Sequence, residues 1–485
     1  MYPNEETGAS GFRKTSRVVP KVDCDLFLEC SIKSSQNAVL LISGLHDSRT
    51  WEFHRMSAGN DIPTTLTMQG YLPRVAGRGI SGALQRRGAV LIEGCRGCGK
   101  TWAARHFARS EARLDSEVLM LLAATDPAAV LDGPTPRLLD EWQNVPHLWN
   151  RVRRECDDRA RPGLFILTGS ASPHDDATRH TGVGRIGRVL MRPMSLYEMG
   201  RSTGQVSLGR LFEGEAASAL PQPDLGLRSV VSSICAGGWP GSLGMDTEKA
   251  RLAVGDYLNE IVRLDLRSAS GVQHRPGAVR RLLRSIARHV ATEAAMTTLA
   301  ADAGGDAPLA RTTVSAYLDA LERVFVVEDQ PAWSVRLRSR ASLRRAPKRH
   351  FVDPSLAASL LRASPERLLG DPQTLGVLFE SLVVRDLRIY GQAHRSDVFH
   401  YRDDTGLEAD AIIERDDGAW IAVEVKLSPA GAVVEGAAKS LLRLRSKVSR
   451  NRTDELAALL VVTSTGAAYR RPDGVQVSPI TALGP

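Results

Sequence analysis

A glycine-rich segment at residues 94–101 reads Gly94-Cys95-Arg96-Gly97-Cys98-Gly99-Lys100-Thr101 and fits the pattern G-x-x-x-x-G-K-[ST]. An apolar run at residues 88–93 precedes it and predicts a strand, and residues 100–110 predict a helix after it. In this context the pattern forms a phosphate loop, because backbone N–H groups turn inward and the helix start adds positive potential. A chance glycine turn is the alternative.

The loop predicts a site for ATP and Mg²⁺. We expect Gly94, Gly97 and Gly99 to let the backbone turn around the phosphates. Lys100 should reach the β- and γ-phosphates, and the Thr101 hydroxyl should hold Mg²⁺. Two cysteines inside the loop form C-x-x-C, but no second pair lies nearby, so we interpret them as small residues rather than zinc ligands.

Asp140 and Glu141 follow a short strand signal at residues 137–139. We expect Asp140 to contact Mg²⁺ directly or through water, and Glu141 to orient or deprotonate the attacking water. This pair favours hydrolysis of ATP over transfer to a second substrate. The alternative is an acidic helix start, because Asp is a common capping residue.

Hydroxyl and arginine side chains further along are candidates for the same site. An apolar run at residues 164–168 ends in Thr168, which we expect to sense the γ-phosphate. Arg185 and Arg188 follow in a glycine-rich stretch, and either could supply positive charge in cis or from a neighbouring copy. Solvated loop arginines are the alternative.

The composition is that of a globular chain. Its 485 residues are 43% hydrophobic and 24% charged, which excludes a mainly disordered, collagen-like or coiled-coil protein. No apolar run has the length of a membrane helix, and Glu5 and Glu6 are atypical of a signal peptide, so we expect a cytoplasmic protein without membrane segments. Six scattered cysteines indicate a reducing compartment, and the net charge of +8 weakly favours a polyanionic partner.

The chain divides into four expected regions. The first lacks a helical or strand period and predicts a poorly ordered extension, unless translation starts at Met56 or Met68. The second predicts an α/β domain with a mostly parallel sheet, because apolar runs such as residues 118–124 alternate with helical segments. Its end, residues 200–225, is rich in Gly, Ser and Pro and predicts a loop or linker. The expected boundaries are 1–66, 67–225, 226–347 and 348–485.

The third region is expected to be helical. Apolar residues recur at helical spacing from Val279 to Val290, and two shorter helices are predicted at 297–303 and 310–323. Residues 324–327 then predict an extended segment. Three helices followed by a strand are typical of a winged helix-turn-helix, which we place at about residues 278–330, although many helical bundles share this order.

Acidic residues and a lysine lie on predicted strands of the fourth region. Asp410 belongs to a strand at 408–414, and Glu424 and Lys426 share one face of a strand at 420–426. Glu380 belongs to a helix at 375–389. The carboxylates would bind Mg²⁺ and the lysine would stabilise developing charge, as in a metal-dependent phosphodiesterase. The alternative is a simple Glu–Lys pair on an exposed strand.

Arginines gather in two places that could follow a nucleic-acid backbone. One is a stripe on the first helix of the winged-helix candidate, and the other is a basic stretch before the fourth region. A solvated face is the alternative. The residues are Arg280, Arg284 and Arg288 in the stripe, and Arg336, Arg338, Arg340, Arg344, Arg345, Lys348 and Arg349 in the stretch.

From about Tyr71 to Pro485 the chain resembles prokaryotic ATP-binding proteins that join an AAA-type P-loop ATPase to a C-terminal PD-(D/E)xK nuclease-like domain. The resemblance rests on the order of the motifs, while Gly241 and Leu264 depart from the usual pattern. It implies an AAA-type P-loop NTPase domain, a winged helix and a restriction-endonuclease-like α/β domain. The motifs are residues 94–101, 138–143, 165–170, 192–196, 237–240, 407–410 and 424–426.

We therefore expect a Mg²⁺-dependent ATPase that acts on or with DNA, with a C-terminal nuclease-like domain of uncertain activity. A nucleotide-switched regulator that binds DNA or protein without cleavage is the main alternative. A purely structural C-terminal domain, with Glu424 and Lys426 as a paired couple, is a third. Oligomeric state, preferred DNA and pathway stay open, and an arginine acting in trans would require an oligomer.

Overall fold

The computed structural model describes residues 70–170, 182–215, 226–265, 275–335 and 346–485, which all belong to one compact unit, Ile62–Pro485. The expected extension at residues 1–66, including Met56, lies outside the described residues. The arginines between 336 and 345 lie outside them as well.

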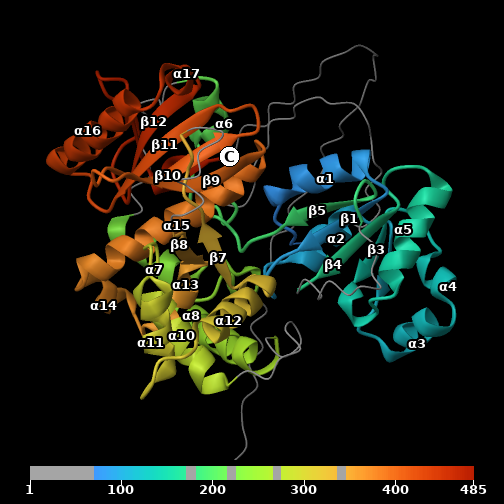
Figure 1. Cartoon of the computed structure of the whole chain (residues 1–485). Coiled ribbons are helices and arrows are strands. Elements are labelled where there is room, and N and C mark those ends of the chain that lie inside the picture. Colours follow the sequence, from blue (N-terminus) through green and yellow to red (C-terminus); the bar gives the residue numbers. More distant parts are fainter. Residues whose placement is uncertain (1–69, 171–181, 216–225, 266–274, 336–345) are drawn as a thin grey trace, which may run out of the picture. The chain divides into compact units, whose positions relative to one another are not determined.

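A five-stranded parallel sheet carries the glycine-rich loop, with strand order β2-β3-β4-β1-β5 (Figure 1). Side chains alternate between its faces: Val90 and Ile92 of β1 enter one core, while Ala89 and Leu91 enter another. A sheet buried on both faces explains the continuous apolar runs of β1 and β4. The strands are β1 Ala89–Glu93, β2 Ser110–Arg113, β3 Arg137–Asp140, β4 Phe165–Gly169 and β5 Ile186–Leu190.

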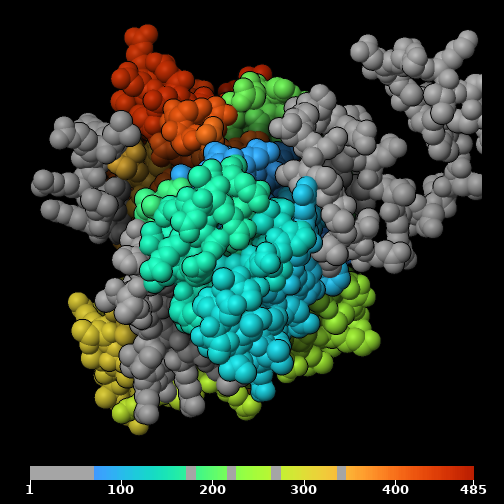
Figure 2. All heavy atoms as spheres, turned by 90° about the vertical axis from the view of Figure 1, so that its right-hand side faces the viewer, coloured from blue at the N-terminus to red at the C-terminus, as the bar shows by residue number. Residues whose placement is uncertain are grey.

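Helices cover both faces of this sheet. Helices α1 and α2 share a core with one face, and α5 packs against the other. Figure 2 views the molecule from the side of α3, α4 and α5. The elements are α1 Ala76–Arg86, α2 Lys100–Phe107, α3 Glu117–Thr125, α4 Pro127–Leu131, η1 Trp142–Asn144 and α5 Leu148–Arg159.

Two expectations about this part are corrected. The apolar run at 118–124 is the helix α3, and the polar segment Ser110–Arg113 is the strand β2 instead. A short apolar run alone cannot distinguish a strand from a helix. The expected linker at 200–225 contains β6 Val206–Ser207 and α6 Leu208–Phe212, and β6 pairs with the last strand of the chain.

The middle of the chain is helical, as expected. Helices α10, α11 and α12 are followed by β7, which pairs antiparallel with β8. Their assignment to a winged helix stays a prediction. The elements are α7 Gly226–Ala236, η2 Pro240–Ser242, α8 Thr247–Glu260, η3 Ile261–Asp265, α10 Pro276–Arg288, α11 Met296–Gly304, α12 Arg311–Arg323, β7 Val327–Gln330 and β8 Lys348–Phe351.

The C-terminal part contains a mixed six-stranded sheet with strand order β13-β14-β12-β11-β10-β9. Its core strands alternate: Ile413 and Val423 share a core with α15, and Ile412 and Ala422 share one with α16. The sheet is therefore covered on both faces. The elements are α13 Pro354–Leu360, α14 Pro365–Leu369, α15 Pro372–Gln392, β9 Ser396–Arg402, β10 Glu408–Arg415, β11 Trp420–Lys426, α16 Gly431–Lys447, α17 Arg450–Asp454, β12 Leu456–Thr463, β13 Tyr469–Arg470, β14 Gln476–Pro479, η5 Ile480–Ala482 and β15 Leu483–Gly484.

Candidate functional site

The glycine-rich segment links β1 to α2, as its sequence predicts. Gly94, Gly97 and Gly99 have φ values of +151°, +77° and +97°, a region that favours glycine. At Gly94 a Cβ atom would lie 2.0 Å from the carbonyl oxygen of Met191. The tight turn of the loop at its start therefore depends on the absence of a side chain.

Lys100 is the first residue of α2, and its side chain folds back into the loop. Its Nζ donates hydrogen bonds to the carbonyl oxygens of Gly94 and Cys95, at 2.9 and 2.8 Å. Only 6% of the residue is exposed. The ammonium group is thus held within the loop by neutral carbonyls and has no ion pair among the described residues, so its charge is available to an anion.

Three further predicted side chains meet at the neighbouring strand ends. The Thr101 hydroxyl donates to Asp140 Oδ1 at 2.9 Å, and the Thr168 hydroxyl donates to the same oxygen at 2.5 Å. Because β1, β4 and β3 are adjacent parallel strands, their carboxyl ends share one edge of the sheet. In open α/β sheets ligands bind at this edge.

Glu141 directly follows this cluster in an unusual backbone conformation. Its φ is +56°, which costs a non-glycine residue of the order of 1 kcal/mol or more. The Glu141 amide donates to Thr168 Oγ1 at 3.4 Å, and Gln143 donates to the Glu141 carboxylate. The first contact ties the Glu141 backbone to β4, and the second orients its carboxylate.

Arg185 does not reach the loop of its own chain. Its carbonyl oxygen accepts a hydrogen bond from Ala89 at the amino end of β1, whereas the loop follows the carboxyl end. The Arg185 guanidinium binds Asp157 of α5 at 2.5 Å. The expectation that Arg185 binds the cofactor in cis is therefore corrected. Arg188 lies further along β5 and binds Glu93, the residue before Gly94, at 3.0 Å.

A pocket of about 290 Å³ adjoins the loop at Gly99, and sequence analysis did not predict it. The Tyr71 ring stacks on His106 at 4.8 Å, and Trp102 remains 47% exposed. The available signal was an aromatic residue two positions after Lys100. The lining includes Tyr71, Leu72, Trp102, Met194, Pro240 and Leu243.

The motifs at 192–196 and 237–240 form a buried support behind the loop. The Met194 amide donates to the Gly238 carbonyl, and the Gly238 amide donates to Asp353. Arg385 of α15 binds Asp353 at 2.8 Å and Asp386 at 2.7 Å, and all three side chains are 1% exposed or less. Breaking such a buried pair typically costs about 3–5 kcal/mol. These motifs therefore act as structural supports.

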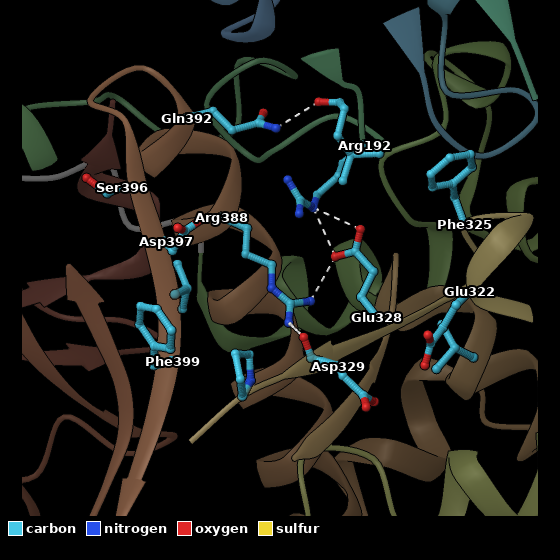
Figure 3. A pocket seen from close by; sticks show the side chains of 14 residues that line it. Arg192, Glu322, Phe325, Glu328, Asp329, Arg388, Gln392, Ser396, Asp397 and Phe399 are labelled. Atoms are coloured by element: carbon cyan, nitrogen blue, oxygen red, sulfur yellow. Dashed lines mark hydrogen bonds and ion pairs between the residues drawn. The ribbon is translucent and has the colours of Figure 1, made fainter. Parts of the chain in front are cut away.

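Charged residues from three segments meet at a second pocket of about 590 Å³. Figure 3 shows the guanidinium groups of Arg192 and Arg388 directed at the Glu328 carboxylate, at 2.9 and 2.8 Å. Burial acts to raise the pKa of Glu328, but the two arginines hold it below its ordinary value. Glu328 on β7 therefore links the segment after β5 to α15.

Four predicted C-terminal residues come together, and a fifth joins them. Lys348 of β8 donates to Glu380 of α15 at 2.7 Å, and Lys426 donates to Glu424 at 2.8 Å. Asp410 of β10 accepts from the Val425 amide at 2.7 Å. We call Lys348, Glu380, Asp410, Glu424 and Lys426 the carboxylate–lysine cluster.

Burial and mutual repulsion shift the carboxyl groups of this cluster. Burial and the nearby Asp410 raise the pKa of Glu380 to about 8 and the pKa of Glu424 to about 7. In the described parts of the chain, no group of three His, Cys, Asp or Glu residues is arranged to hold a metal ion. The expected metal site at Asp410, Glu424 and Glu380 is therefore not preformed. Two ammonium groups, those of Lys348 and Lys426, lie among the carboxylates instead.

The basic residues are only partly where a nucleic-acid surface would need them. Arg280, Arg284 and Arg288 are exposed on α10, as expected. Lys348 and Arg349, however, are each 8% exposed, which corrects their expected place on a surface that follows a nucleic-acid backbone and also excludes the alternative of a solvated face. Arg349 donates to the Ala294 carbonyl, and Lys348 belongs to the cluster.

Three protein families match three separate segments of the chain. Residues 86–200 match a family described as AAA domain, residues 227–367 match a domain of unknown function (DUF8612), and residues 375–483 match another (DUF4143). The first match contains the phosphate loop and the parallel sheet. Residues 86–200 thus form an AAA-type P-loop domain.

Two curated relatives are uncharacterized proteins of Mycobacterium bovis and Mycobacterium tuberculosis, each 27% identical over 310 residues. The alignment covers 63% of this chain and 63% of each relative. The chain therefore matches less than two thirds of the length of these relatives.

Among solved structures, the Walker-type ATPase of Pyrococcus abyssi is 15% identical with a TM-score of 0.38, covering 62% of this chain and 99% of that one. The replication initiator DnaA bound to AMPPCP and single-stranded DNA is 12% identical with a TM-score of 0.24, covering 51% and 86%. With TM-scores below 0.5, neither likeness bears on the function of this chain.

No helix in the described residues is long and apolar enough to cross a membrane.

Proposed function

We propose that this chain binds ATP with Mg²⁺ at the phosphate loop and hydrolyses it. One observation carries this proposal: Lys100, Thr101, Asp140 and Thr168 meet at the carboxyl edge of the parallel sheet. The Asp140 carboxylate and the Thr101 hydroxyl offer hard oxygen ligands, and Mg²⁺ in nucleotide sites needs only one or two carboxylates besides the phosphates. Mg²⁺ would there neutralise charge on the phosphates.

The remaining residues of the site have separate roles in this proposal. Lys100 exchanges its two carbonyl partners for the β- and γ-phosphates. Glu141 lies one residue beyond Asp140 and accepts the proton of the attacking water, or orients that water. Thr168 contacts the γ-phosphate from β4. An arginine acting on a neighbouring copy is the role still open to Arg185.

The pocket beside Gly99 is proposed to hold the adenine base. Its volume of about 290 Å³ suits a single purine, and Tyr71 and Trp102 offer aromatic surface for stacking. Base–aromatic stacking typically contributes about 1–3 kcal/mol. The pocket adjoins Gly99, so one nucleotide would occupy the pocket and the loop together.

Replacement of the loop lysine tests the ATPase proposal. Lys100→Ala should lower ATP hydrolysis by about a thousandfold, because the phosphate charge loses its main fixed cation. Lys249→Ala is the matched control, since Lys249 lies on α8 with its side chain 74% exposed. Wild-type turnover in folded Lys100→Ala protein would rule out this site.

For the rest of the chain we propose an action on or with DNA. The order of α10, α11, α12 and β7 fits a winged helix, and the exposed arginines of α10 offer charge to a phosphate backbone. The approach of Glu380, Asp410, Glu424 and Lys426 supports a PD-(D/E)xK nuclease-like domain. Metal-dependent cleavage would use the carboxylates as ligands.

A nucleotide-switched regulator without cleavage is the second candidate. It is favoured by the two lysines that neutralise the carboxylates where a nuclease would place its metal. Incubation with ATP, Mg²⁺ or Mn²⁺ and single-stranded, duplex and branched DNA separates the two. Cleavage that is lost in Lys426→Ala supports the nuclease, whereas DNA binding that changes with nucleotide and never leads to cleavage supports the regulator.

A further inference from the structure

Asp410 has an ammonium group on each side of its carboxylate. Lys348 Nζ lies 3.8 Å from Asp410 Oδ1, and Lys426 Nζ lies 3.8 Å from Asp410 Oδ2. Lys348 is the more buried of the two lysines, with its side chain 10% exposed against 32% for Lys426. Lys348 also binds Glu380 at 2.7 Å, so it bridges two of the three carboxylates.

This position is where a divalent cation would have to sit to share Glu380 and Asp410. Mg²⁺ and Mn²⁺ bind carboxylate oxygens at close range, and an ammonium group between the same oxygens competes by charge and by volume. Glu424 keeps one buried oxygen, Oε2, without a hydrogen-bond partner among the described residues. The cluster thus retains an unused ligand atom next to a position filled by lysine.

We propose that Lys348 is a built-in counter-cation that keeps the carboxylate–lysine cluster closed to divalent metal until its ammonium group withdraws. The inference rests on the proposed function, in which the cluster is a nuclease-like metal site. It assigns the regulation of that site to a residue that lies on β8, outside the predicted Asp…Glu-x-Lys motif. Lys348 is not a catalytic residue in this proposal, because it excludes the metal and contacts no substrate.

The strand that carries Lys348 is connected to the phosphate loop by a short series of contacts. In the β7–β8 pair Lys348 lies opposite Gln330, whose side chain donates to the Asp410 carbonyl at 3.0 Å. Glu328 of the same β7 binds Arg192 and Arg388 (Figure 3). Arg192 directly follows Met191, whose carbonyl accepts from Cys98 Sγ inside the loop. A shift of the loop therefore has a physical route to Lys348.

Mn²⁺ binding without nucleotide tests the inference. Binding is measured by the loss of the free Mn²⁺ signal in electron paramagnetic resonance, on full-length wild type, Lys348→Met and Lys348→Gln. The glutamine variant keeps a hydrogen-bond donor toward Glu380 in case the methionine variant fails to fold. Lys249→Met makes the same charge change on an exposed residue of α8 and serves as the matched control.

We expect at least about a tenfold gain in Mn²⁺ affinity in both Lys348 variants, because a like charge is removed from the carboxylates. The control should bind as wild type does, and Glu424→Gln in the Lys348→Met background should abolish the gain. Wild type that binds Mn²⁺ as tightly as the Lys348 variants, in a Glu424-dependent way, overturns the inference and leaves the metal site intact. If no variant shows Glu424-dependent binding, both the role of Lys348 and the proposed metal site are overturned.

Discussion

The phosphate loop and the carboxylate–lysine cluster both contain buried lysine and carboxylate groups, but these charged groups have different partners in the two regions. In the loop, Lys100 binds neutral carbonyls, and Asp140 accepts bonds from two hydroxyls. In the cluster, Lys348 and Lys426 pair directly with Glu380 and Glu424. A fixed charge without an internal counter-charge is available to an external ligand, whereas removal of one partner of a buried ion pair leaves an uncompensated charge and destabilises the fold.

Loss of a lysine should therefore affect stability differently in the two regions. Lys348→Met leaves Glu380 and Asp410 short of a buried counter-charge, and we expect it to lower the free energy of unfolding by about 3 kcal/mol. Lys100→Ala removes two hydrogen bonds to carbonyls but also removes the cost of burying an ammonium group without a counter-charge, so the net loss should be about 1 kcal/mol or less. Urea unfolding at pH 9 without nucleotide, above the pKa of about 8 of Glu380, measures both values.

The contrast would be broken by equal losses in the two variants. Such a result would mean that Lys100 is as much a part of the folded core as Lys348. Lys249→Ala, on an exposed side chain, provides the baseline for removal of a solvated lysine.

The proposed base pocket tests whether the phosphate-loop region binds an external ligand. Trp102→Ala should weaken ATP binding about fivefold, because one stacking surface of the pocket is lost. Trp102 is 47% exposed, so the fold should tolerate the change. Fluorescent-nucleotide titration gives the affinity, and Trp102→Phe should retain most of it. An alanine variant that binds ATP as wild type does would place the base elsewhere.

The smallest effect is expected at Glu322, whose carboxyl lacks a full counter-charge but belongs to an exposed residue, so that solvent screens its charge. Partial burial, with Asp329 and Asp319 nearby, raises the pKa of Glu322 to about 7, and Arg349 opposes this only in part. The folded state therefore binds more protons than the unfolded state between about pH 4.3 and 7, and this contribution to stability is lost as the pH rises through that window. Glu322→Gln should be more stable than wild type at pH 8, with a clearly smaller advantage at pH 5.

Urea unfolding of both proteins at the two pH values measures this effect. A glutamine variant whose advantage is the same at pH 5 and pH 8 would show that the carboxyl charge is not responsible.

Sequence reasoning succeeded where the signal is local. Residues 94–101 are contiguous, and their chemistry requires a strand before them and a helix after them, so the loop could be placed from the sequence. The helix at 375–389 and the strand at 420–426 likewise agree with α15 and β11, because their apolar patterns are long enough to be distinctive.

It failed where an answer depends on distant partners. The polar segment Ser110–Arg113 became a strand because it pairs with β3, which its own composition does not indicate. Arg185 was placed at the loop because the order of residues does not say at which end of a strand a side chain lies. Lys348 was interpreted as part of a basic stretch that could follow a nucleic-acid backbone, although it contacts Glu380 and Asp410 from further along the chain.

The phosphate loop, with its glycines, lysine and threonine, can be read directly from contiguous residues, because local backbone geometry and the helix start create the anion site. The charge state of the C-terminal carboxylates cannot be predicted from contiguous residues. Their charged neighbours come from β8, α15, β10 and β11, which must first pack together. Coulomb interactions between buried groups depend on separations of a few ångströms, and only the packed strands and helices set those separations.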